Sequence, residues 1–264
     1  MTRRFLQNKK ILLTRPGGVS DFLRDSIDNA GGQSLYIPSM SITALEDDSL
    51  SKQLLGKIAD FDILIFVSRN AVKYAHSSLA ELSCRVLSKV VIAIGLGTRS
   101  ELLLLGISDV RAVDSNNGSA ALLNMTELSS KNLTNKKIMI LRGVGGRELL
   151  NTELTKRGAK VNYVELYRRA KPQVSASTIS NIWLEKKPNV VFITSAEGLE
   201  NLLEMSKGEE RSRFLNTPLV VISPRLKAVA KSAGFTAEIK VTNGYSDEDF
   251  MLTLKEMFEA LENE

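Results

Sequence analysis

A glycine-rich segment near the middle of the chain has the residue types and spacing of an anion-binding turn. It reads Leu-Arg-Gly-Val-Gly-Gly-Arg-Glu-Leu-Leu over residues 141–150. An apolar run of strand length (137–141) precedes it, and apolar residues at helical spacing (Leu149, Leu150, Leu154) follow it. Such a turn presents free N–H groups at a helix N-terminus, which suits an anionic group. A tight turn without any ligand is the alternative that these residues leave open.

The segment does not match the two common nucleotide-binding motifs. A Walker A loop needs Gly-Lys-Ser/Thr at its end, whereas Gly146 is followed here by Arg147 and Glu148. A dinucleotide fingerprint needs a third glycine where Glu148 stands. The sequence therefore favours an anion that is not a nucleotide.

Strands and helices alternate around this segment, which predicts parallel α/β sheets. Strands are expected at 10–13, 34–37, 61–67, 90–94, 137–141 and 161–166, and helices at 20–30 and 147–157. The second half repeats the first: 11–15 corresponds to 138–142, 31–36 to 158–163, 63–68 to 190–195 and 91–95 to 220–223. A repeat this long predicts two similar, flavodoxin-like lobes rather than a solenoid.

Ligands of open α/β sheets bind beyond the carboxyl ends of the strands. The residues at these ends are arginines, hydroxyls and glycines, with no carboxylate among them: Arg15, Ser68, Gly95, Thr98, Arg142, Gly143, the rest of the turn to Gly146, Ser195 and Ser223. Such groups are usual for binding several carboxylates or phosphates. Alternatively Ser68, Ser195 and Thr98 are helix N-caps, a role that does not exclude ligand contact.

Composition narrows the class of protein. The 264 residues are enough for two modest domains or one large one, and the net charge of +5 is unclustered. That charge fits an acidic small molecule better than nucleic acid, which needs a denser basic stripe. Cys84 and His76 are the only residues of their types, so a disulfide framework, a cysteine metal cage and a histidine triad are excluded. Both are expected on a helix surface or in the core.

Nothing in the sequence predicts a membrane partner. No run of eighteen apolar residues occurs, and residues 1–10 have no apolar signal core. We therefore expect the protein in the cytoplasm.

Six short motifs occur in order along the chain. They are Thr-Arg-Pro at 14–16, Ala-Ile-Gly at 93–95, Leu-Arg-Gly at 141–143 with Gly-Gly-Arg-Glu-Leu at 145–149, Gly-Ala-Lys-Val at 158–161, Glu-Leu-Tyr-Arg-Arg at 165–169 and Ile-Thr-Ser at 193–195. In this order, and in a duplicated chain of this length, they resemble the uroporphyrinogen-III synthase family. The resemblance extends from Ile11 to the C-terminal helix near Leu261.

The resemblance implies a lyase of tetrapyrrole and heme biosynthesis that needs no metal or organic cofactor. Its substrate would be hydroxymethylbilane, a linear tetrapyrrole with eight carboxylates, which hydroxymethylbilane synthase could hand over. The product would be uroporphyrinogen III, formed with loss of water and inversion of ring D. A monomer that binds neither nucleic acid nor membrane is expected.

The resemblance also implies two α/β lobes joined by a two-stranded β linker, with the active site in the cleft between them. Residues 1–37 and 170–264 would form lobe 1, and residues 38–169 lobe 2. The segments 36–39 and 164–167 are short, β-prone and equivalent in the repeat, so they could pair as the linker. Such a hinge would permit the lobes to close.

Tyr167 matches the family's tyrosine, which is thought to assist departure of the substrate hydroxyl. A phenol is a weak acid, so a hydrogen bond is a better description of this role than full proton transfer. The alternative is a linker tyrosine that only packs the hinge. The chain departs from the family at 223–226, Ser-Pro-Arg-Leu, where the last turn often carries Thr, so Ser223 or its backbone would have to substitute.

Two other classes of function remain open at this point. One is a non-catalytic, two-lobed binding module for a polyanionic small molecule. The other is a nucleotide-using α/β enzyme, which the missing glycine and Lys-Ser/Thr motifs disfavour.

Overall fold

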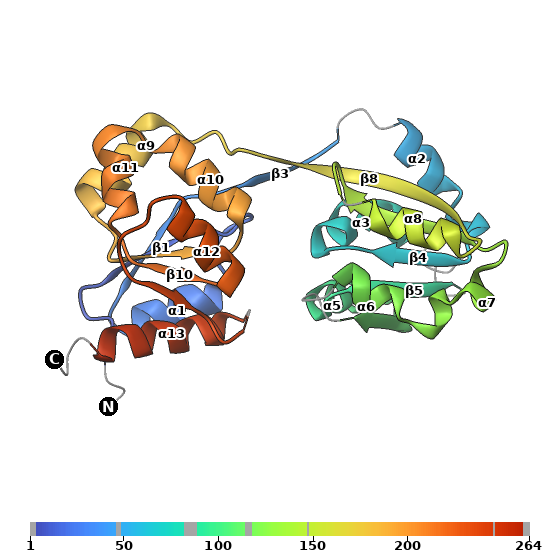
Figure 1. The fold of residues 1–264 in the computed structure, drawn as a ribbon, viewed down its shortest axis with the longest axis horizontal. Helices are drawn as coiled ribbons and strands as arrows, with labels where there is room; N and C mark the ends of the chain where they lie inside the picture. The colour runs from blue at the N-terminus through green and yellow to red at the C-terminus, as the bar shows by residue number, and fades with distance from the viewer. Residues whose placement is uncertain are drawn as a thin grey trace. The chain divides into compact units, whose positions relative to one another are not determined.

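The chain forms two compact α/β units (Figure 1). The computed structural model describes residues 4–45, 49–81, 89–113, 118–146, 148–244 and 246–260. Unit 1 comprises Met1–Ile42 and Ala170–Glu264, and unit 2 comprises Thr43–Arg169. The first boundary thus falls after Ile42, whereas the sequence prediction placed it after residue 37. The cleft between lobes stays a prediction.

Unit 1 is built on a five-stranded parallel sheet with the order β11-β10-β9-β1-β2. The strands are β1 (Lys10–Leu13), β2 (Gln33–Tyr36), β9 (Val190–Ile193), β10 (Leu219–Val221) and β11 (Ile239–Val241). Counted along the unit, this is the 2-1-3-4-5 order of flavodoxin-like folds. The predicted fold class is therefore confirmed.

Helices cover both faces of the unit 1 sheet. They are α1 (Asp21–Asn29), α9 (Ala176–Ser180) with the π-helix Asn181–Lys186, α10 (Ala196–Met205), α11 (Gly208–Leu215), α12 (Pro224–Ser232) and α13 (Asp247–Ala260). Alternate strand residues face opposite sides. Leu13 packs with α1 and α13, which lie side by side in Figure 1, and Leu12 packs with α10 and α12. Burial on both faces explains the continuous apolar strands.

Unit 2 has the same architecture, but the chain passes through the corresponding strands in a different order, beginning with β4. Its sheet has the order β3-β8-β7-β4-β5-β6. The strands are β3 (Ser41–Ala44), β4 (Ile63–Phe66), β5 (Val90–Ile94), β6 (Val110–Val113), β7 (Lys137–Gly143) and β8 (Lys160–Ala170). Strands β8-β7-β4-β5-β6 are parallel and correspond to β2-β1-β9-β10-β11. The predicted duplication is thus visible as one sheet order used twice.

Short helices connect the strands of unit 2. They are α2 (Ser49–Gly56), a 3-10 turn (Ile58–Asp60), α3 (Arg69–Glu81), α5 (Leu96–Leu104), α6 (Gly118–Leu123), a second 3-10 turn (Thr126–Leu128), α7 (Ser130–Leu133) and α8 (Leu149–Lys156). Leucines of α6 and α8 pack on the sheet face formed by Ile65 and Ile140. Gly31 and Gly158, at φ 87° and 94°, follow α1 and α8 at equivalent points of the repeat.

The two-stranded linker uses a different segment from the one predicted. Strand β3 pairs with the end of β8: Ser41 Oγ donates to the Ala170 carbonyl (3.2 Å) and Leu45 N–H to the Leu166 carbonyl (3.4 Å). The pairing of residues 36–39 with 164–167 was therefore wrong. Tyr36 belongs to β2, where it pairs with Leu13. Pro38 follows and has no N–H to extend that ladder.

Some predictions fall on particular helices or outside the described residues. His76 lies exposed on α3, and a helix surface was one of the two places expected for it. Cys84 and Arg147 lie outside the described residues, as does Leu261. None of the described helices combines the length and the apolar composition required to cross a bilayer.

Candidate active site in unit 2

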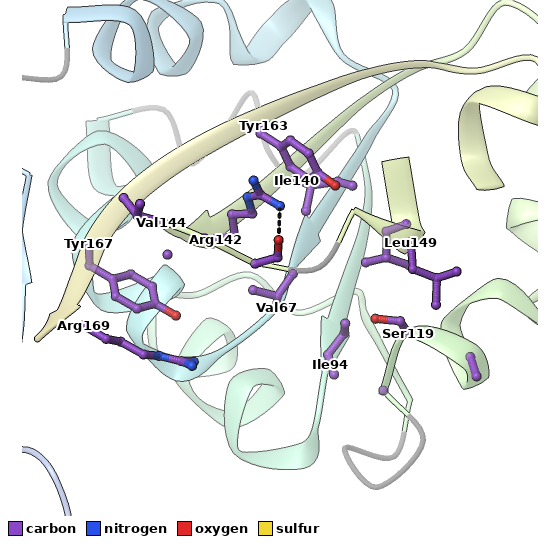
Figure 2. Close-up of a pocket in the computed structure, with 16 residues that line it drawn as sticks. Val67, Ile94, Ser119, Ile140, Arg142, Val144, Leu149, Tyr163, Tyr167 and Arg169 are labelled. Atoms are coloured by element: carbon purple, nitrogen blue, oxygen red, sulfur yellow. Dashed lines mark hydrogen bonds between the residues drawn. The ribbon is translucent and has the colours of Figure 1, made fainter. Parts of the chain in front are cut away.

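A pocket of about 690 Å³ lies at the carboxyl edge of the unit 2 sheet (Figure 2). Its lining comes from the ends of β4, β5 and β7, from the first turns of α6 and α8, and from β8. Strands β7 and β4 are neighbours, and their connections leave in opposite directions along the sheet. This switch point is where open α/β sheets bind ligands.

Tyr167 forms part of the pocket wall and is held from several sides. The side chain is 1% exposed, and its ring stacks on Tyr74 with centroids 5.6 Å apart. The hydroxyl lies 2.8 Å from Ser68 Oγ, which also accepts the Ala71 N–H (3.1 Å) and so caps α3. The structure therefore brings together two predicted site residues, Tyr167 and Ser68. Tyr167 packs as a core side chain and lines the pocket as well.

A β-bulge places Tyr167 opposite the glycine turn. Arg142 pairs with Glu165 across β7 and β8, but the next partner of β8 is Tyr167, opposite Gly143. The extra residue shifts the register, and Val144 N–H then donates to the Tyr167 carbonyl (2.9 Å). A Cβ on Gly143 would lie 2.5 Å from the Tyr167 ring. Glycine is therefore required at 143 by the ring itself, and bulges often re-aim side chains next to active sites.

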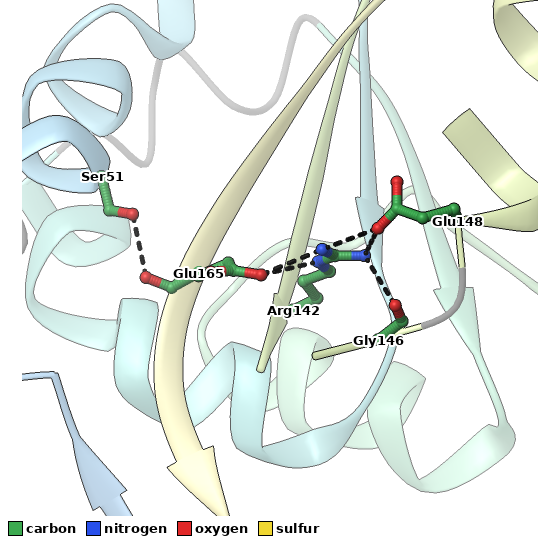
Figure 3. Close-up of polar contacts among 5 residues, drawn as sticks. All are labelled: Ser51, Arg142, Gly146, Glu148 and Glu165. Carbon is green, nitrogen blue, oxygen red and sulfur yellow. Dashed lines mark hydrogen bonds and ion pairs between the residues drawn. The ribbon is translucent and has the colours of Figure 1, made fainter. Parts of the chain in front are cut away.

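Arg142 lines the pocket, and neighbouring groups of the protein occupy its guanidinium (Figure 3). It is 8% exposed, and all five of its N–H groups have acceptors. Nε and Nη2 donate to Glu165 (3.2 and 2.9 Å), Nη1 and Nη2 to Glu148 (both 3.1 Å), and Nη1 to the Gly146 carbonyl (3.3 Å). Its Cζ lies 3.5 Å from the centre of the Tyr163 ring.

Two carboxylates from outside the predicted set of site residues reach this guanidinium. Glu148 follows the turn and Glu165 stands opposite Arg142 on β8, so both carboxylates reach the guanidinium. Arg142 ties the glycine turn to the neighbouring strand and so holds the shape of the pocket. Burial raises the pKa of the adjacent Tyr163 hydroxyl, with further increases from the Glu148 charge and hydrogen bond, whereas the Arg142 charge lowers it.

Arg169 is the pocket cation that the sequence prediction missed. It is exposed and lines the pocket, and it forms no ion pair within the described part of the chain. Figure 2 shows Arg169 on the same side of the pocket as Tyr167. The two residues lie two positions apart on β8, so their side chains share a face of the strand. That spacing in Tyr-Arg-Arg was the signal available from sequence.

Comparisons with known proteins agree with this architecture over nearly the whole chain. A family model described as uroporphyrinogen-III synthase HemD matches residues 21–242. The uroporphyrinogen-III synthase of Salmonella typhimurium LT2 is 30% identical over 244 residues, 92% of this chain and 98% of that protein. The chain belongs to the uroporphyrinogen-III synthase family. The Escherichia coli K12 enzyme is 28% identical over 245 residues, again 92% and 98% of the two chains.

Solved structures of uroporphyrinogen-III synthases have the same fold. A mutant enzyme from the extremely thermophilic bacterium Thermus thermophilus gives a TM-score of 0.59 at 16% identity and covers 97% of this chain and 100% of its own. The Helicobacter pylori 26695 enzyme gives 0.58 at 16% identity, with 96% and 99% covered. At such identities the likeness supports the fold alone. The family resemblance recognised in the sequence is confirmed by the closer relatives.

The predicted site residues of unit 1 have structural partners within that unit. Arg15 forms an ion pair with Asp247, whose other oxygen accepts the Ser20 hydroxyl (2.5 Å). Ser195 Oγ accepts the Gly198 N–H (3.0 Å) and Ser223 Oγ the Leu226 N–H (3.2 Å). Both serines are thus N-caps, of α10 and α12. Arg15 was predicted to bind ligand, but here its Nη1 is engaged by a carboxylate.

Two predicted residues of unit 2 lie at the start of α5. Gly95 is the N-cap at φ 88°, and the helix begins at once with Leu96. Thr98 is therefore inside the first turn and only 3% exposed. The alternative of an N-cap at Thr98 was wrong, because Gly95 occupies that position. Burial also argues against a ligand contact by its hydroxyl, whereas Ile94, just before Gly95, lines the pocket.

Proposed function

We propose that this chain converts hydroxymethylbilane into uroporphyrinogen III and water, acting as a cyclising lyase without metal or organic cofactor. The observation that carries the proposal is the Tyr167 hydroxyl, fixed by Ser68 in the wall of a pocket at the sheet switch point. Family membership supports the same reaction. We also propose a cytoplasmic, monomeric enzyme that receives its substrate from hydroxymethylbilane synthase.

The chemistry sets two tasks for the protein. Loss of the substrate hydroxyl leaves an azafulvenium cation, which ring D attacks through its substituted α-carbon to form a spiro intermediate. That intermediate fragments and recloses with ring D reversed. Closure in solution uses the free α-carbon instead and gives isomer I. The protein must therefore hold the bilane in a folded conformation and assist departure of the hydroxyl.

Tyr167 is the group proposed to assist that departure. A hydrogen bond from its hydroxyl to the leaving oxygen stabilises the negative charge that develops as the C–O bond breaks. Packing against Tyr74 and over Gly143 fixes the ring, so little reorganisation is needed at the moment of reaction.

Arg169 is proposed to bind one of the substrate carboxylates. It is the exposed cation beside Tyr167, whereas Arg142 is occupied by Glu148 and Glu165. Val144 and Leu149 are apolar pocket residues that are 41% and 44% exposed, and they offer contact area for a pyrrole ring. A cation next to apolar surface suits a pyrrole that carries acetate and propionate groups.

The test is an isomer assay. Purified protein is incubated with freshly prepared hydroxymethylbilane, and the products are oxidised and separated as porphyrin isomers. The proposal predicts isomer III as the main product, with heat-inactivated protein giving isomer I. A non-catalytic binding module would instead bind the bilane and leave isomer I as the product.

A further inference from the structure

Ser68 has a second contact that helix capping does not account for. It stands between β4 and α3, and its Oγ accepts the Ala71 N–H at 3.1 Å. The same oxygen lies 2.8 Å from the Tyr167 hydroxyl, which reaches it from the far end of β8. We propose that Ser68 is a positioning residue, which orients the Tyr167 hydroxyl and stabilises its oxygen as the substrate hydroxyl leaves. This inference rests on the proposed function.

Counting donors and acceptors shows how the pair can work. A serine hydroxyl has one hydrogen to donate and two lone pairs to accept with. Ala71 N–H occupies one lone pair, which leaves the Ser68 hydrogen available for Tyr167. When Ser68 donates to the tyrosine oxygen, the Tyr167 hydrogen is free for the leaving hydroxyl. The order of donation is then Ala71 to Ser68 to Tyr167 to substrate.

This order places charge stabilisation where the reaction needs it. The substrate C–O bond breaks with its electron pair on oxygen, and that oxygen accepts a hydrogen bond from the Tyr167 hydroxyl as negative charge develops on it. The carbon is left as an azafulvenium cation. Ser68 donates to the Tyr167 oxygen and also caps the N-terminus of α3, so both groups support the hydrogen bond to the leaving oxygen. The departing hydroxide becomes water with the proton that the α-carbon of ring D loses at the final closure.

The internal repeat separates this role from capping. Ser195 occupies the position equivalent to Ser68, follows β9 as Ser68 follows β4, and caps α10 through the Gly198 N–H (3.0 Å). Met40 stands at the repeat position of Tyr167 and has no hydroxyl. Among the described residues, Ser195 Oγ therefore shows capping alone, whereas Ser68 Oγ shows capping together with a bond to Tyr167.

The experiment uses substitutions at Ser68 that separate its capping of α3 from its hydrogen bond to the Tyr167 oxygen. Ser68→Thr keeps both the capping oxygen and the hydroxyl hydrogen. Ser68→Asp keeps the capping oxygen but has no hydrogen to donate and adds a negative charge beside Tyr167. Ser68→Ala loses both. We expect near wild-type kcat for Ser68→Thr, about tenfold lower kcat for Ser68→Ala, and a larger loss for Ser68→Asp although its stability is retained. KM should change little in all three.

A double-mutant cycle then tests whether Ser68 acts through Tyr167. Combined with Tyr167→Phe, Ser68→Ala should lower kcat no further, because the oxygen that it supports is absent. Ser175→Ala, which removes the N-cap of α9 in the same way, should reduce stability without changing kcat. Equal losses of kcat from Ser68→Ala with and without the Tyr167 hydroxyl would overturn the inference, as would wild-type kcat in Ser68→Asp. Absence of isomer III from the wild-type protein would instead overturn the proposed function.

Discussion

Tyr167 and Gly143 face each other across a β-bulge so closely that a Cβ at position 143 would lie 2.5 Å from the tyrosine ring. The bulge turns the end of β8 toward the glycine turn, and the missing side chain leaves room for the ring. The shape of the pocket wall at Tyr167 therefore depends on the glycine turn, the strand register and the aromatic ring together.

Gly143→Ala should damage both stability and turnover. The added methyl forces the ring or the turn to move, and such overpacking costs roughly 1–3 kcal/mol. Urea unfolding checks the stability, and the isomer assay checks turnover. Gly56→Ala is the matched control, because its φ is ordinary and a methyl group added there would have no atom within 4 Å. Equal stability of the Gly143→Ala and Gly56→Ala variants would show that the ring contact is not restrictive.

Arg142→Lys should destabilise unit 2 although the charge is kept. A lysine is a point charge with three donors and cannot reproduce five hydrogen bonds to Glu148, Glu165 and the Gly146 carbonyl. We expect a loss of about 1–2 kcal/mol in urea unfolding. Arg24→Lys, at an exposed pair with Asp21, serves as the control and should change stability by less than about 0.5 kcal/mol. An Arg142→Lys variant with the stability of the wild-type protein would mean that the hydrogen bonds of Arg142 contribute no net stability.

Arg169→Met should raise KM for hydroxymethylbilane while kcat and stability stay near wild type. Loss of one carboxylate contact of about 0.5–2 kcal/mol corresponds to an increase in KM of roughly twofold to thirtyfold. Steady-state kinetics at low salt give the most sensitive measurement, because salt screens an exposed contact. Arg168→Met is the control, since Arg168 is exposed on β8 but does not line the pocket. Similar KM values for the two variants would remove Arg169 from the site.

Asp62 should make stability depend on pH in the acid range. Its hydrogen bonds from the Lys137 N–H (2.8 Å) and from Lys136 Nζ (2.9 Å) hold its pKa below the usual value. A lowered folded-state pKa contributes stability above the unfolded pKa, and this is lost as pH falls through the folded pKa. The wild-type protein should therefore be more stable than Asp62→Asn at pH 7. This difference in stability should shrink as the pH falls below 3.8, the ordinary pKa of an aspartate.

Urea unfolding at several pH values measures the Asp62 effect. Asp60→Asn is the control, because Asp60 is an exposed carboxylate on the same segment. A stability difference between wild type and Asp62→Asn that stays constant from pH 7 to pH 3 would contradict the assignment.

Most strands could be predicted because a parallel sheet buried on both faces produces continuous apolar runs. Strands β4 and β9 are buried at every position, and both are evident in the sequence. Strand β3 was missed because Ser41–Ala44 is short, half polar and partly exposed, with no apolar period. The linker was consequently assigned to the preceding segment, where Tyr36 in fact completes β2.

The contacts of the site residues could be predicted only where residues close in the sequence make them. Serines after strands cap the following helices, as at Ser195 and Ser223. Contacts that depend on strand register could not be predicted, because Glu165 meets Arg142 only through the pairing of β8 with β7. Thr98 was misplaced because Gly95, at φ 88°, lets α5 begin within one residue.

The central claim is that the Tyr167 hydroxyl assists ring closure with inversion of ring D, and the isomer assay on Tyr167→Phe tests it most directly. The substitution keeps the ring and its packing on Tyr74, so the unfolding midpoint should change little. Formation of isomer III should slow by about one to three orders of magnitude, and isomer I should appear as unprocessed bilane closes in solution. Wild-type formation of isomer III by a folded Tyr167→Phe variant would contradict the account.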